Sequence, residues 1–169
     1  DLAHRSRQPV QLGRILGFMA SERFRDGDVT LAHDLYDEPI AWSAAYRGLW
    51  HEVRYLHQAA RFNAELGAWG TVRSLVDRMD VTVRLYPHPN PRVHMLHVLR
   101  VEFMRAHVTL AAGRRDEAIE IFERGYGQLE EHRLVEHKVS ASELWCRSLF
   151  DAGEPDLALG VALRALEVA

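Results

Sequence analysis

The sequence predicts an all-α fold, a stack of about four helical hairpins, on two observations about the spacing of its small residues. First, four glycines recur at separations of 40, 46 and 40 residues: Gly27, Gly67, Gly113 and Gly153. Second, small or short apolar side chains stand seven residues before and five residues after each glycine: Ala20, Ala60, Ala106 and Cys146, then Ala32, Val72, Ala118 and Ala158. Glycine readily adopts the left-handed conformation that ends a helix, and small side chains let two antiparallel helices approach closely. A period of this length is typical of a solenoid, so we expect a binding scaffold rather than a catalytic domain.

The elements follow in order along the chain. In the first hairpin, apolar residues recur at a helical spacing from Val10 to Arg25, and Asp28 is placed to cap the second helix. The later hairpins carry similar apolar stretches to their own turn glycines. We expect about eight principal helices in hairpins over residues 10–38, 40–80, 92–131 and 133–168, all within one domain of residues 1–169.

The prolines are expected at the edges of these helices, because proline disrupts a helix interior. Pro39 is therefore predicted to follow the first hairpin. Residues 80–92, which include Pro87, Pro89 and Pro91, are predicted to interrupt the helical pattern between the second and third hairpins.

Composition narrows the function classes. The 169 residues are 47% hydrophobic and 27% charged, which suits one soluble domain, and the net charge of −3 argues against binding nucleic acid by bulk charge. Cys146 is the only cysteine, so one chain cannot form a disulfide framework or a cysteine zinc site. No apolar stretch reaches the length of a membrane span, and we expect a cytoplasmic protein that contacts no membrane. Because the sequence begins at Asp1 rather than methionine, we expect it to be part of a longer polypeptide.

Two segments resemble tetratricopeptide repeats, in which a small residue before a turn is followed by an alanine. They are residues 110–122, which turn at Gly113, and residues 149–158, which turn at Gly153. The resemblance implies a right-handed superhelix whose concave surface is lined by the first helix of each hairpin. The longer period of this chain is similar to that of the repeats in the sensor regions of bacterial MalT-like multidomain regulators. That similarity implies the sensor or regulatory part of a bacterial transcriptional regulator or signalling protein.

A column of basic residues on the first helices is the candidate binding site. Twenty of the 21 lysines and arginines are arginine, which favours bidentate recognition of anions. The residues thirteen and six positions before the turn glycines include Arg14, Arg54, Arg61, Arg100, His107 and Arg147. Together they predict a cationic concave groove for carboxylates or phosphates. The alternative is that these arginines are ordinary solvated surface.

Enzymatic chemistry is not indicated. Ten histidines are present, but neither Glu-x-x-His nor His-Glu-x-x-His occurs, and no phosphate-binding glycine loop is found. We expect no metal, no cofactor and no catalytic residue. The expected partner is a protein, a peptide or an anionic small effector, without direct nucleic acid contact by this segment. The alternative function is assembly, as a homodimer through the last hairpin, because the exposed end of an open solenoid leaves apolar helix surface without a neighbour.

Overall fold

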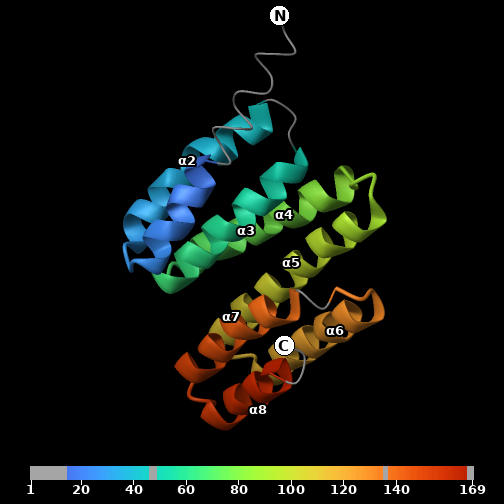
Figure 1. Ribbon diagram of the computed structural model, residues 1–169. Helices are drawn as coiled ribbons and strands as arrows, with labels where there is room; N and C mark the ends of the chain where they lie inside the picture. Colours follow the sequence, from blue (N-terminus) through green and yellow to red (C-terminus); the bar gives the residue numbers. More distant parts are fainter. Residues whose placement is uncertain (1–14, 46–48, 135–136, 167–169) are drawn as a thin grey trace, which may run out of the picture. The chain divides into compact units, whose positions relative to one another are not determined.

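The computed structural model describes residues 15–45, 49–134 and 137–166 (Figure 1). The regular elements of these residues are all helices, which confirms the all-α class and the expected number of about eight. They are a helix over residues 15–25, α2 (Val29–Ala45), α3 (Leu49–Glu65), α4 (Trp69–Leu85), α5 (Pro91–Ala111), α6 (Arg115–Glu131), α7 (Lys138–Asp151) and α8 (Pro155–Leu166). None of the described helices combines the length and the apolar character that crossing a membrane requires.

The four predicted turn glycines all adopt the left-handed conformation. Their φ angles are 84°, 69°, 77° and 81° at Gly27, Gly67, Gly113 and Gly153. Each turn is closed by the same two backbone bonds: the glycine N–H donates to the carbonyl three residues before it, and the next N–H donates to the carbonyl five residues before its own position. At Gly113 these bonds run to Leu110 and, from Arg114, to Thr109. This is the Schellman motif, and its fourfold recurrence confirms the predicted helix ends.

The two columns of small residues lie in the helix contacts. Ala20, Ala60 and Ala106, which precede the turns, are fully buried, and Cys146 is half-buried. Ala32, Val72, Ala118 and Ala158, which follow the turns, are also buried. Seven of the eight small residues are therefore buried, as close packing of helices requires.

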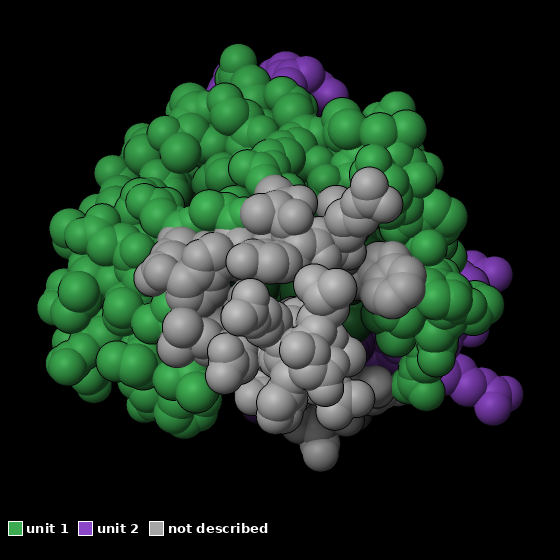
Figure 2. Space-filling view, turned by 90° about the horizontal axis from the view of Figure 1, so that it is seen from above, with its two compact units in different colours: residues 1–101 green, residues 102–169 purple. Residues whose placement is uncertain are grey.

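The chain divides into two compact units, residues 1–101 and residues 102–169, shown in green and purple in Figure 2. The boundary falls within α5. In the first unit α2 packs on α3 and α3 packs on α4, whereas in the second α7 packs on both α8 and α6. The single domain and its hairpin boundaries stay a prediction.

Each unit has an aromatic core. In the first unit, the Phe62 ring lies 4.7 Å from that of Phe24 and 5.2 Å from that of Tyr36, measured between centroids. In the second, the Phe122 ring stacks on Trp145 with a centroid separation of 4.6 Å and an interplanar angle of 9°. Such contacts stabilise the helix packing beyond the burial of apolar area.

Two of the expected helix ends are wrong. Pro39 lies inside α2 rather than after the first hairpin. The reason is packing: Ala32, Tyr36 and Ile40 form a buried stripe on α2, and the apolar stripe outweighs the roughly 3 kcal/mol that an interior proline costs. Likewise α4 continues past residue 80 to Leu85, because buried Met79 and Val83 extend its helical spacing.

A fifth turn of the same kind has no glycine. After α6, Arg133 has a φ of 54°, its N–H donates to the Glu130 carbonyl, and the Leu134 N–H donates to the Leu129 carbonyl. Leu134 is 1% exposed. Its burial holds Arg133 in the left-handed conformation, which is unfavourable for residues other than glycine.

Candidate anion-binding site

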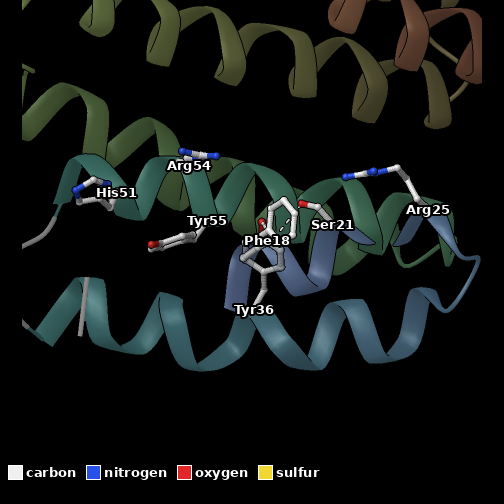
Figure 3. A pocket seen from close by; sticks show the side chains of 8 residues that line it. Phe18, Ser21, Arg25, Tyr36, His51, Arg54 and Tyr55 are labelled. Atoms are coloured by element: carbon white, nitrogen blue, oxygen red, sulfur yellow. Dashed lines mark hydrogen bonds between the residues drawn. The ribbon is translucent and has the colours of Figure 1, made fainter. Parts of the chain in front are cut away.

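The first unit contains a cavity of about 350 Å³ bounded by the helix of residues 15–25, α2 and α3. Its walls include Phe18 and Ser21 from the first of these helices, Tyr36 from α2, and His51, Arg54 and Tyr55 from α3. In Figure 3, Phe18, Ser21, Tyr36 and Tyr55 lie in the middle of the view, and His51 and Arg25 lie toward its two ends. The cavity therefore lies between the first helices of two successive predicted hairpins.

The floor of the cavity is held by hydrogen bonds to one carbonyl. Tyr36 donates from its hydroxyl to the Gly17 carbonyl oxygen at 3.2 Å, and Ser21 Oγ donates to the same oxygen at 2.9 Å. Burial raises the pKa of Tyr36, so its hydroxyl stays a neutral donor. The Tyr36 ring lies 6.0 Å from that of Tyr55. The floor is thus aromatic and fixed in position.

The rim carries positive charge. Arg25 is paired with Glu22, its Nη2 lying 2.5 Å from the carboxylate. Arg54 is exposed, and the described residues offer it no carboxylate within ion-pair distance. Phe18 lines the same cavity with 65% of its surface exposed. An exposed apolar ring and an exposed guanidinium without a carboxylate partner therefore line one cavity.

Two more of the predicted arginines lie in the same unit and are less exposed. Arg61 on α3 is half-buried, and its Nε is fully buried without a hydrogen-bond acceptor. Arg100 on α5 is half-buried, and burial, followed by the charge of Arg54, lowers its pKa to about 10. Removing a guanidinium from water without giving it a partner is unfavourable. Arg54, Arg61 and Arg100, which we call the arginine cluster, therefore form an anion-deficient region.

Eight other described arginines differ from this cluster because they face carboxylates. Ion pairs are formed by Arg25, Arg78, Arg84, Arg105, Arg114, Arg115, Arg124 and Arg164. Within the described residues, the arginine cluster lacks the carboxylate partners that these eight arginines have.

A buried histidine lies near the cluster. His97 on α5 is 6% exposed, and its ring meets that of His88 edge to face at 5.9 Å. Burial, and then the charge of Arg100, lowers the pKa of His97 to about 3, so this side chain is neutral near pH 7. The described residues contain no group of three or more His, Cys, Asp or Glu side chains arranged to hold a metal ion.

The predicted groove residues are divided between the two units. Arg54, Arg61 and Arg100 share the first unit, whereas His107 and Arg147 belong to the second, and Arg14 lies outside the described residues. His107 is 2% exposed, and its Nδ1 lies 2.6 Å from Ser148 Oγ on α7. Its ring therefore packs against α7. Arg147 is exposed on α7.

Sequence reasoning missed the aromatic walls, Phe18, Tyr36 and Tyr55. Their helical spacing suits a core, and only the fold places them at a cavity. One signal was available: Tyr36 and Tyr55 set phenol groups on otherwise apolar helix faces, where a hydroxyl needs a polar neighbour.

A comparison of the chain with family models, curated proteins and solved structures finds no match.

Proposed function

We propose that this chain is a non-enzymatic binding domain that recognises an anionic partner through the arginine cluster. The partner is a protein, a peptide or a small effector that supplies carboxylates or phosphates. In the arrangement that tetratricopeptide-like hairpins imply, these arginines line the concave side. Binding there would serve as the sensing step of a larger regulatory protein.

The observation that carries the proposal is the uncompensated charge of Arg100 and Arg61. A solvated arginine needs no partner, but Arg100 has lost much of its water and the Nε of Arg61 has lost all of it. An anion placed against the cluster would restore both the hydrogen bonds and the charge balance. Charge-assisted bonds of this kind are stronger than neutral ones, and arginine forms them in bidentate pairs.

The test is a titration with a fluorescein-labelled decaglutamate peptide at low salt, followed by fluorescence anisotropy. The Arg54→Gln/Arg61→Gln variant should bind at least about tenfold more weakly than the wild type, because each lost charge-assisted contact contributes about 1.5–3 kcal/mol. The matched control is Arg23→Gln/Arg73→Gln, which removes the same charge from two exposed positions of the same unit. Equal affinity of the two double variants would reject the proposal, since bulk charge would then explain the binding.

Self-association through α8 is the second candidate function. Leu159, Leu163 and Leu166 are 60%, 54% and 72% exposed, and their spacing places them on one face of that helix. Val161 on the same helix is 5% exposed and belongs to the core. Sedimentation velocity at several concentrations tests this function. A concentration-dependent dimer that Leu163→Glu abolishes would support it, and a monomer throughout would reject it.

A further inference from the structure

We propose that the cavity bounded by the helix of residues 15–25, α2 and α3 binds a small aromatic carboxylate, with its ring against Phe18 and Tyr36 and its carboxylate on Arg54. This ligand would be the small effector of the binding domain proposed above, and the inference rests on that function. Its contacts differ from those of a peptide, because they depend on the cavity and do not require Arg61 or Arg100.

The size of the cavity favours a small molecule over a peptide chain. Its volume of about 350 Å³ lies at the lower end of the range of about 300–1,000 Å³ that is usual for ligand pockets. A one- or two-ring molecule fits this space. A peptide would cover the arginine cluster but place at most one side chain inside.

The walls favour an aromatic ring. Tyr36 and Tyr55 are buried with tilted rings whose centroids lie 6.0 Å apart, so their positions are fixed. Phe18 lines the cavity (Figure 3), is 65% exposed, and makes no ring contact within the described part of the chain. An exposed phenylalanine beside a cavity gains most when a flat apolar group covers it, because aromatic pairs gain both buried area and ring contact.

The charges favour a single carboxylate. Among the described wall residues, Arg25 already binds Glu22, whereas Arg54 has no carboxylate partner. No acidic side chain lines the cavity in the described residues. One guanidinium offers a bidentate site that matches a carboxylate in shape and charge. The hydroxyl of Tyr36 is already committed to the Gly17 carbonyl, so it orients the ring wall rather than the anion.

The test uses isothermal titration calorimetry of the full chain with naphthoate and with naphthamide, its neutral counterpart. Naphthoate should bind, and naphthamide should bind at least about tenfold more weakly because it cannot form the charge-assisted pair. Arg54→Gln should weaken naphthoate binding by a similar factor and remove the preference over the amide. Arg73→Gln, the matched control on an exposed face of α4, should bind naphthoate as the wild type does.

Two further variants probe the ring contact. Phe18→Ala removes an exposed side chain and should weaken naphthoate several-fold without changing the melting temperature. Phe150→Ala is its control, because Phe150 is 68% exposed on α7 and lines no part of the cavity. Equal affinities for naphthoate and naphthamide, or unchanged naphthoate binding in Arg54→Gln, would overturn the inference.

The outcomes separate this inference from the proposed function. Binding of decaglutamate without binding of naphthoate rejects the cavity ligand and leaves the arginine cluster as the site. Binding of naphthoate that depends on Arg54 but not on Arg61 or Arg100 supports the cavity ligand, whatever the peptide does. Binding of neither probe rejects both.

Discussion

Arg78 on α4 donates two hydrogen bonds to one carboxylate oxygen of Glu52 on α3, from Nε at 2.8 Å and from Nη2 at 2.5 Å. Glu52 is 3% exposed, so the guanidinium replaces most of the water that the carboxylate loses on folding. The pair joins the two helices of one predicted hairpin.

Removing the arginine should therefore leave a buried carboxylate without its partner. We expect Arg78→Ala to lower the free energy of unfolding by about 2 kcal/mol, measured by urea denaturation. Arg73→Ala on the same helix removes an exposed arginine and should change stability by less than about 0.5 kcal/mol. A similar loss of unfolding free energy in both variants would show that the Arg78–Glu52 contact does not stabilise the fold.

A second prediction concerns substitution of the turn glycines. Their positive φ angles, rather than a lack of space, disfavour other residues there. A Cβ at Gly113 would meet no atom within 4 Å, yet the φ of 77° disfavours any side chain. Gly113→Ala should lower the free energy of unfolding by about 1 kcal/mol.

Gly127 is the matched control for Gly113. It lies inside α6, is exposed, and also has nothing within 4 Å of an added Cβ. Gly127→Ala should raise stability by up to about 1 kcal/mol, since alanine favours the helix. Thermal unfolding of both variants should thus show shifts of opposite sign, and shifts of the same sign would contradict the assigned turn.

His97 should make stability depend on pH. Burial, then the charge of Arg100, lowers the folded pKa to about 3 from an ordinary value of 6.5. Between these values the unfolded chain binds the proton and the folded chain does not, so this contribution is complete above pH 6.5 and is lost as the pH falls. The slope contributed by this one group approaches, at most, about 1.4 kcal/mol per pH unit.

The measurement is urea denaturation of wild type and His97→Leu at pH 7.5 and pH 5. Leucine cannot be protonated, so the variant should lose less stability than the wild type between the two values. An equal loss in both proteins would exclude His97 as the cause.

Arg100 should oppose stability while serving the proposed binding. Burial and the charge of Arg54 lower its pKa to about 10, which shows that its site disfavours the charged form. Arg100→Met retains the apolar stem and removes the charge, so the melting temperature should rise in the absence of ligand. Differential scanning calorimetry tests this, and a lower melting temperature would show that the guanidinium is already compensated.

The regular parts of this fold could be predicted from sequence because they depend on local chemistry. Gly27, Gly67, Gly113 and Gly153 end helices through their own backbone freedom, and the alanines around them mark close helix contacts wherever the period holds. Pro39 was mispredicted because its intrinsic preference was overruled by the buried stripe of α2. The Arg133 turn was missed because the burial of Leu134, and not the arginine itself, selects that conformation.

For the candidate site, the sequence by itself determined the spacing that placed Arg54 and Arg100 at matching positions on successive first helices, and Arg61 on the same helix as Arg54. It did not determine which of them would lack a partner. Only the tertiary structure decided that Glu52 accepts hydrogen bonds from Arg78, that His107 is buried against α7, and that Phe18 lines a cavity. The physical reason is that helix ends depend on neighbours in sequence, whereas desolvation and ion pairing depend on side chains that folding brings together from distant helices.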